Sequence, residues 1–177
     1  MSIIKHKEQR VAVLIDAQNM YHSAKNLYSA RVNFKEVLKT AVAGRKLVRA
    51  VAYVIKTESG EESPFFEALT KTGIETKVKD LQIFYGGMKK ADWDVGIAVD
   101  AMRLGPQVDA LVLITGDGDF IPLVEYLKSQ GKQIEVIAFS KSASSKLIEE
   151  ADDFIDLSKE ESKYLIKSRG RRPSDNK

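Results

Sequence analysis

The sequence contains no cysteine and only two histidines, His6 and His22, among its 177 residues. Without cysteine the chain forms no disulfide, offers no thiolate nucleophile and builds no zinc-ribbon site. The two histidines are too few and too isolated in the sequence for a histidine-rich metal site. Disulfide-rich, thiol-dependent and zinc-ribbon proteins are thereby excluded.

Long apolar runs are also missing. No segment approaches the ~20 apolar residues that a membrane-spanning helix needs. The N-terminus, MSIIKHKEQR, lacks the apolar stretch of a signal peptide, so we expect a cytoplasmic protein with no membrane partner. Hydrophobic residues make up 44% and charged residues 30% of the chain, which is ordinary for a soluble protein, and the length fits one domain.

The net charge of +3 is unevenly distributed. Seven of the 28 basic residues, but only three of the 25 acidic ones, lie from Ser158 to the end, so the rest of the chain is close to neutral. Attraction to a polyanion would come from local patches and from this end. We expect an N-terminal extension at 1–9, one folded domain at 10–158 and a basic, disordered tail at 159–177.

Strand-like and helix-like patterns alternate along most of the chain. Val11–Ile15 is a continuous apolar run, typical of a strand that is buried on both faces, and Asn19 is placed to cap the helix that follows. We expect further strands at 47–55, 74–78, 81–85, 111–115, 133–138 and 154–157, and further helices at 34–42, 63–73, from Asp92 or Asp94 to Leu104, at 121–130 and at 144–151. This alternation predicts an α/β fold, a three-layer α/β/α sandwich with a mostly parallel central sheet.

The most informative stretch is L-V-L-I-T-G-D-G-D-F at 111–120. A buried strand here ends in a turn that carries Asp117 and Asp119, and a helical pattern follows at once. Ligands of open parallel α/β sheets bind at the carboxyl ends of the strands. We therefore expect a site at this turn.

Two further carboxylates should reach the same edge of the sheet. Asp16 follows the strand at 11–15, and Asp94 stands at the start of a helix. Four carboxylates gathered there would raise each other's pKa unless a divalent cation neutralised them. An all-oxygen site favours Mg²⁺ or Mn²⁺ over Zn²⁺, and such a site can hold the metal against a phosphodiester and activate a water.

Each of these residues also has an ordinary structural interpretation. Asp16 and Asp117 could be turn residues, and Asp94 could be a helix-start carboxylate favoured by the dipole. Asp119 could be a helix N-cap, although Pro122 would then occupy a position that normally donates an N–H. The agreement of all four in location favours the metal site.

Asp100 and Asp92 are less clearly placed. Asp100 lies six positions beyond Asp94 and would point about 120° away on a regular helix, so it either pairs with Arg103 or supports the site from behind. Asp92 is a surface or capping residue in this interpretation.

Several α/β enzyme classes are excluded by missing motifs. The sequence has no phosphate-binding G-x-x-x-x-G-K-[ST] loop, no dinucleotide-binding G-x-G-x-x-G loop and no G-x-S-x-G nucleophile turn. A phosphoaspartyl enzyme of the haloacid dehalogenase type would carry an aspartate where Gln18 stands.

Four segments together resemble a known family. They are V-L-I-D-A-Q-N at 13–19, K-A-D-W-D-V-G-I-A-V-D-A at 90–101, L-I-T-G-D-G-D-F-I-P-L-V at 113–124 and A-D-D-F at 151–154. The chain resembles the NYN family of PIN-like nuclease domains, in particular the LabA-like (DUF88) branch of bacteria. The resemblance covers nearly the whole body of the chain and leaves the two ends unmatched.

The resemblance implies a PIN-like α/β/α fold and a ribonuclease that uses Mg²⁺ or Mn²⁺. An extra residue leaves both Asp92 and Asp94 as candidates for the family's first helix acid, and we favour Asp94 because Val95 follows it as in the family. Thr115 stands where the family more often has serine. The implied metal-binding and catalytic acids are Asp16, Asp94, Asp117 and Asp119, with Asn19, Asp100 and Thr115 in support.

The implied partner is RNA, expected to be single-stranded. Lys89, Lys90 and either Arg103 or Lys141 are candidate phosphate contacts, and the alternative for each is a solvated surface cation. The basic tail would add nonspecific affinity or serve only solubility. The sequence leaves open both a monomer and a homodimer.

The leading interpretation is thus a metal-dependent endoribonuclease. The alternatives are a weakly active or inactive regulatory or RNA-binding module that retains the acidic pocket, and a hydrolase of small phosphate esters.

Overall fold

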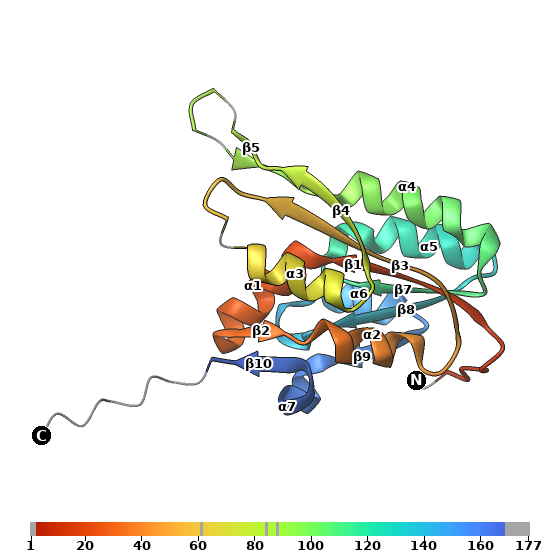
Figure 1. Cartoon of the computed structure of the whole chain (residues 1–177). Helices are drawn as coiled ribbons and strands as arrows, with labels where there is room; N and C mark the ends of the chain where they lie inside the picture. The colour runs from red at the N-terminus through yellow and green to blue at the C-terminus, as the bar shows by residue number, and fades with distance from the viewer. Residues whose placement is uncertain (1–2, 61, 84, 88, 169–177) are drawn as a thin grey trace, which may run out of the picture.

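The computed structural model of the protein describes residues 3–60, 62–83, 85–87 and 89–168, and of Gln82, Lys89 and Lys90 the backbone alone. A six-stranded parallel sheet with the order β4-β3-β1-β7-β8-β9 forms its centre (Figure 1). These strands are β1 (Arg10–Asp16), β3 (Lys46–Lys56), β4 (Glu75–Asp80), β7 (Ala110–Ile114), β8 (Gln133–Ala138) and β9 (Asp153–Asp156).

Helices cover both faces of this sheet. One core cluster joins one face to α1 (Ala17–Tyr28), α2 (Phe34–Val42) and α3 (Ser63–Lys71). The other core cluster joins the opposite face to α4 (Asp94–Leu104), α5 (Ile121–Ser129) and α6 (Ser145–Glu150). Alternate residues of β1 divide between the clusters, with Val13 in the first and Leu14 in the second, as strand geometry requires. The predicted three-layer α/β/α sandwich is confirmed.

The strand expected at 11–15 is buried on both faces. Val11, Ala12, Val13 and Ile15 have no exposed surface and Leu14 is 1% exposed, because β1 lies between β3 and β7 with helices on either side. The valine, leucine and isoleucine side chains in this central position contribute about 1.5–3 kcal/mol each on burial. The first strand of the chain therefore occupies the middle of the sheet.

The start of α1 differs from the sequence expectation. Its N-cap is Asp16, whose Oδ1 accepts a hydrogen bond from the backbone N–H of Asn19 at 3.3 Å. Asn19 is the third residue of the helix, and its own side chain is used elsewhere. The expectation that Asn19 caps this helix is therefore wrong, because the acid at the strand end already satisfies that N–H.

Two short antiparallel pairs lie outside the main sheet. β5 (Gln82–Ile83) pairs with β6 (Lys89–Lys90) and lies within the strand expected at 81–85, of which Phe84 is outside the described residues. The second pair joins β2 (Ala30–Val32), which the sequence analysis did not predict, to β10 (Leu165–Lys167).

Part of the expected disordered tail is folded. After the 3₁₀ turn Leu157–Glu160, α7 (Glu161–Tyr164) leads into β10, and Tyr164 is 2% exposed with its hydroxyl 2.8 Å from Thr40 Oγ1. The expectation of disorder is therefore wrong for 161–167, because the apolar residues there complete the core beside α2. The remainder of the tail, 169–177, lies outside the described residues.

Within the part of the chain that the structure describes, no helix is both long and apolar enough to cross a membrane.

Candidate metal centre

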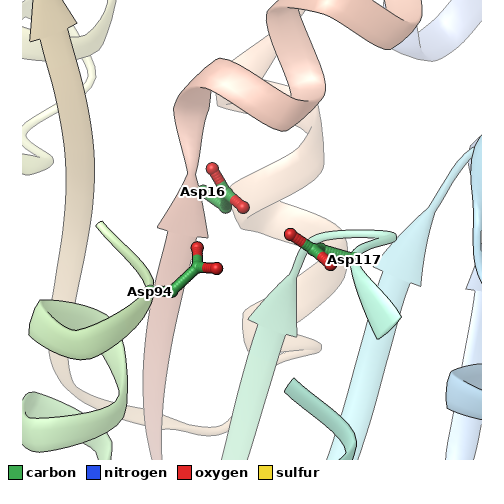
Figure 2. A group of neighbouring side chains, drawn as sticks. All are labelled: Asp16, Asp94 and Asp117. Atoms are coloured by element: carbon green, nitrogen blue, oxygen red, sulfur yellow. The ribbon is translucent and has the colours of Figure 1, made fainter. Parts of the chain in front are cut away.

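Three of the four predicted acids converge at one edge of the sheet. Asp16 ends β1, Asp117 follows β7, and Asp94 is the first residue of α4. One carboxylate oxygen of each lies within 4.8 Å of the others, and Figure 2 shows the three side chains pointing toward one another. Because β1 and β7 are hydrogen-bonded parallel neighbours, their ends meet as the sequence analysis expected.

Thr115 joins two of these acids through its hydroxyl. Its Oγ1 donates to Asp16 Oδ2 at 3.0 Å and accepts from the backbone N–H of Asp117 at 3.2 Å. The side chain is 2% exposed, so water does not compete for these bonds. Thr115 therefore fixes the position of the Asp16 carboxylate relative to the turn that carries Asp117.

Asn19 supports the same turn from α1. Its Oδ1 accepts a hydrogen bond from the backbone N–H of Gly116 at 2.9 Å. This bond connects the start of α1 to the end of β7, two segments that are far apart in the sequence. Asn19 is thus positioned beside Asp16, as the family resemblance implied, and it acts on the loop through its side chain.

The glycines of the G-D-G turn are required by close packing. A Cβ on Gly116 would lie 2.9 Å from the Cα of Ala143, and one on Gly118 would lie 2.9 Å from Ser144 Oγ. The turn is also hydrogen-bonded to this neighbour, because Gly116 O accepts from the backbone N–H of Ser144 at 2.9 Å. The loop between β8 and α6 therefore packs directly against the turn that carries Asp117.

Trp93 anchors the start of α4, where Asp94 lies. Its indole Nε1 donates to the carbonyl of Val54 at 2.9 Å, and its ring packs against Tyr53 with centroids 5.4 Å apart. Lys79 Nζ lies 4.3 Å from the indole centroid on the exposed side. The sequence analysis did not assign this anchoring role, which depends on partners in β3 and β4.

The structure distinguishes Asp94 from Asp92. Asp94 belongs to the three-carboxylate group, whereas Asp92 Oδ1 accepts from the backbone N–H of Asp94 at 3.2 Å. Asp92 is an exposed residue that bonds the first N–H of α4 from the position before the N-cap, Trp93. It also lines the cavity that the three acids face.

Burial and like charges disfavour ionisation at this site. Burial raises the pKa of Asp16, which hydrogen bonds from Asn19 and Thr115 oppose. Burial, followed by the charges of Asp117 and the neighbouring aspartates, raises the pKa of Asp94 to about 6. A cation among these oxygens would remove the repulsion.

The donor set fits a hard divalent cation. The three acids face a cavity of about 170 Å³ whose other walls include Gln18, Asn19 and Trp93. All the polar donors in reach are oxygen or amide groups, which suit Mg²⁺ or Mn²⁺ and do not suit metals that prefer sulfur.

Asp119 lies beside this group but outside it. Among the described residues, the carboxylates that meet within 4.8 Å do not include Asp119. It is exposed, its backbone N–H donates to Asp117 Oδ1 at 2.9 Å, and its charge is one of those that raise the pKa of Asp94. Asp119 lies in the 3₁₀ turn Gly118–Phe120, and the cap of that turn is Asp117, so the N-cap alternative does not apply to Asp119.

Asp100 is engaged elsewhere. It accepts hydrogen bonds from the Tyr53 hydroxyl and from Lys77 Nζ, both at 2.7 Å. Burial opposes ionisation, but these partners outweigh it and lower the pKa of Asp100. Asp100 therefore pairs with Lys77 and not with Arg103, the partner named in one of the two alternatives, and it is not among the converging acids.

The candidate RNA contacts are placed unequally. Arg103 lies in the last turn of α4, nine residues from Asp94, which is about 14 Å along the helix axis. Arg103 therefore lies at the other end of α4 from the acids. Lys141 lies in the 3₁₀ turn after β8, with Nζ 5.9 Å from the Tyr28 ring centroid. Lys89 and Lys90 form β6, and their side chains are outside the described structure.

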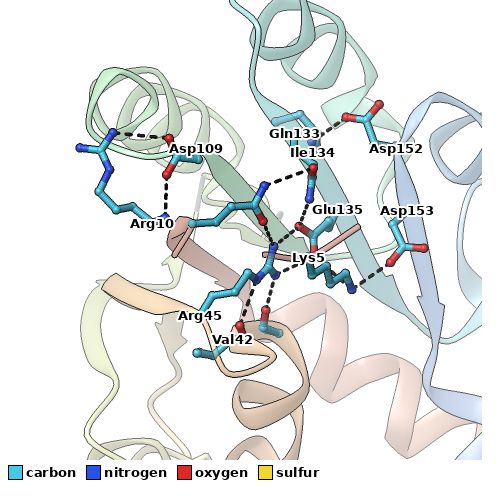
Figure 3. Close-up of polar contacts among 12 residues, drawn as sticks. Lys5, Arg10, Val42, Arg45, Asp109, Gln133, Ile134, Glu135, Asp152 and Asp153 are labelled. Carbon is cyan, nitrogen blue, oxygen red and sulfur yellow. Dashed lines mark hydrogen bonds and ion pairs between the residues drawn. The ribbon is translucent and has the colours of Figure 1, made fainter. Parts of the chain in front are cut away.

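A second charged cluster lies at the opposite end of the sheet (Figure 3). Arg45 and Glu135 are 5% and 1% exposed and form two hydrogen bonds of 2.7 and 2.9 Å. Arg45 also donates to the carbonyls of Ala41 and Val42, and Lys5 contacts Glu135 at 3.3 Å. Because its charges are paired, this cluster stabilises the fold and offers no free ligand.

Comparisons with known proteins agree with this geometry. A family model described as the NYN domain matches residues 10–158, which include all the acids described above. The chain belongs to the NYN family. The match spans every strand of the central sheet, so the NYN domain is the whole α/β/α sandwich.

Two relatives and one solved structure are similar to this NYN domain. An uncharacterized protein of Methanocaldococcus jannaschii is 30% identical over 158 residues, covering 86% of this chain and 57% of the relative. The low amplitude and bright protein LabA of Synechococcus elongatus is 25% identical over 166 residues, covering 85% of each. This similarity supports the LabA-like branch.

The solved structure is that of a protein of unknown function from Vibrio parahaemolyticus. It superposes with a TM-score of 0.81 at 30% identity, covering 93% of this chain and 100% of that chain. The chain therefore spans all of that structure but only about half of the archaeal relative's length.

Proposed function

We propose that this NYN domain is a metal-dependent ribonuclease, which hydrolyses phosphodiester bonds of RNA at the acidic group. The observation that supports it most strongly is the meeting of Asp16, Asp94 and Asp117 within 4.8 Å from three separate segments. Three carboxylates held so close in a cavity make a site for Mg²⁺ or Mn²⁺. When bound, the metal would lower the pKa of a water and polarise the phosphoryl oxygens.

The residues of the chain have distinct parts in this proposal. Asp16, Asp94 and Asp117 are the metal ligands, and Asp119 would hold the cation through water or orient the attacking water. Thr115 positions Asp16, because the hydrogen bond from its hydroxyl restricts rotation of the Asp16 carboxylate. Asn19 holds the loop after β7 against the start of α1 through its bond to the Gly116 N–H.

The central experiment is cleavage of single-stranded RNA with Mg²⁺ or Mn²⁺ by the wild type and by Asp117→Asn. The exchange keeps the size of the side chain and removes the charge, so activity should fall at least 100-fold, in the range seen when electrostatic catalytic groups are removed. EDTA should abolish activity of the wild type.

Asp109→Asn is the matched control. Asp109 precedes the same strand, β7, at its opposite end, where it accepts a hydrogen bond from the backbone N–H of Arg10 at 2.7 Å. Its variant should retain full activity. Cleavage that survives Asp117→Asn, or that ignores EDTA, would show that another centre is responsible.

Two other outcomes identify the alternatives. RNA binding without cleavage under any metal would indicate a noncatalytic regulatory or RNA-binding module. Hydrolysis of a model phosphodiester with no cleavage of RNA would indicate an enzyme for small phosphate esters.

A further inference from the structure

A second cavity, of about 650 Å³, lies between α1, β2, the start of α3 and β10. Figure 1 shows these elements gathered at one end of the molecule, toward the left of the view. We name this cavity the basic groove, and its lining includes Tyr21, Lys25, Arg31, Phe65 and Ile166. Its charged lining residues are Lys25 and Arg31, and no acid is among them.

Charge distinguishes the basic groove from another cavity of similar size. That cavity, of about 700 Å³, lies at the ends of β3 and β4, where Glu58, Glu62 and Asp80 outnumber Lys56. A phosphate placed there would face a net negative charge, whereas the basic groove would attract it. Between two cavities of similar size, electrostatics therefore favours the basic groove for a polyanion.

One face of α1 runs from the metal centre toward the basic groove. Gln18, Tyr21 and Lys25 are spaced i, i+3 and i+7, so they share a helix face. Gln18 lines the cavity of the three acids, and Lys25 lines the basic groove. Seven residues of helix span about 10 Å, so an extended strand at the metal centre can reach the groove.

The groove also combines exposed cations with an aromatic side chain, the two kinds of group that bind single-stranded nucleic acid. Lys25 and Arg31 are exposed, and neither forms an ion pair within residues 3–60, 62–83, 85–87 and 89–168. Tyr21 is half-buried beside them with its ring 5.7 Å from Lys25 Nζ, and it packs against Phe65. Free cations beside an aromatic and apolar wall bind phosphates and unstacked bases together.

We propose that the basic groove binds the single-stranded RNA that extends from one side of the metal centre, with Lys25 and Arg31 on its phosphates and Tyr21 beside its bases. The proposal rests on the proposed function for the identity of the polyanion.

The test measures RNA binding without cleavage. Wild type and the double variant Lys25→Ala/Arg31→Ala are titrated with a fluorescent single-stranded RNA 12-mer in EDTA, at several salt concentrations. Each lost phosphate contact lowers the slope of log K against log salt by about 0.7 for a single strand. The double variant should therefore lose about 1.4 from the slope, and its affinity at low salt should fall several-fold.

The control removes two cations from the far end of the sheet. Lys7 and Lys46 are exposed there, and Lys7→Ala/Lys46→Ala should keep the wild-type slope. A second variant, Lys25→Gln/Arg31→Gln, keeps more of each side chain and should behave as the alanine pair does. Thermal melting of all variants identifies any loss that comes from unfolding.

The inference is overturned if the groove variants keep the wild-type slope, or if the control variant loses as much. It is also overturned if the groove variants lose binding to phosphatidylserine vesicles while RNA binding is unchanged, since the groove would then be a membrane surface. Failure of the proposed function gives a different result. If cleavage is unchanged by Asp117→Asn, the proposed function fails, while the salt dependence of RNA binding still tests the groove independently.

Discussion

Replacing Asp94 with asparagine should stabilise the metal-free protein. Burial and the surrounding aspartates raise the pKa of Asp94 from 3.8 to about 6, which corresponds to about 3 kcal/mol at 1.36 kcal/mol per pKa unit. The side chain faces a cavity open to water, and solvent screening reduces this to about 1 kcal/mol. For a chain of this size, 1 kcal/mol shifts the melting temperature by about 2–4 °C.

The sign follows from the direction of the shift. Below pH 3.8 the carboxyl is neutral in the folded and unfolded states, so Asp94 has no unfavourable effect there. Between pH 3.8 and about 6 the unfolded chain ionises first, and the stability of the wild type falls. Above about pH 6 the carboxyl is ionised in both states, and the loss of wild-type stability is complete. Asp94→Asn should therefore melt about 2–4 °C higher than wild type at pH 7.5 in EDTA, with the difference much smaller at pH 4.

Differential scanning fluorimetry across this pH range measures the effect. Glu67→Gln removes an exposed charge from α3 and should leave the melting temperature unchanged. Added Mn²⁺ should raise the melting temperature of the wild type more than that of the variant, because binding to the folded state stabilises it. A variant that melts below wild type at pH 7.5, or a difference equal at pH 4 and pH 7.5, would refute the electrostatic reasoning.

Three further predictions follow from the contacts. Thr115→Val removes the hydroxyl bonded to Asp16 and should weaken Mn²⁺ binding, measured by calorimetry, by about 10–100-fold. Thr115→Ser should restore the affinity, and equal Mn²⁺ affinities of wild type and Thr115→Val would contradict the positioning role. Arg45→Met removes both guanidinium bonds from the buried Glu135 and leaves it the ion pair with Lys5 at 3.3 Å. The free energy of unfolding in urea should fall by about 3 kcal/mol, the low end for a broken buried pair, and adding Glu135→Met should recover most of it. A loss under 1 kcal/mol would argue against the network. Gly116→Ala should lower the melting temperature by at least 2 °C through its backbone clash, and an unchanged melt would show that the loop moves freely.

The fold and the acids were predictable because both follow from local patterns. Buried strands such as Val11–Ile15 are recognised in the sequence as continuous apolar runs. Acids that follow two strands meet if those strands are parallel neighbours in the sheet. Asp16 ends one such strand and Asp117 lies three residues after the other, and their carboxylates meet in the structure. Asp119, predicted with them, lies outside the three-carboxylate group. The helix pattern left Asp92 and Asp94 open, and the family resemblance favoured Asp94, because Val95 follows it.

Other features were not predictable because they depend on distant partners. Asp100 of α4 bonds Lys77 of β4 and Tyr53 of β3. No spacing along the chain indicates these contacts. β2 and β10 are three residues each, too short for a periodic pattern, and they become strands by pairing with each other. Burial of Arg45 against Glu135 likewise depends on tertiary packing alone.

The central place of β1 in the sheet has a consequence for synthesis of the protein. Asp16 leaves the ribosome early, but the hydroxyl that orients it belongs to Thr115, 99 positions later in the chain. At typical rates of about 5–20 residues per second, the nascent chain spends about 5–20 s without a complete ion pocket. Uptake of a cation would therefore mark a late stage of maturation, after the strands on both sides of β1 have joined it.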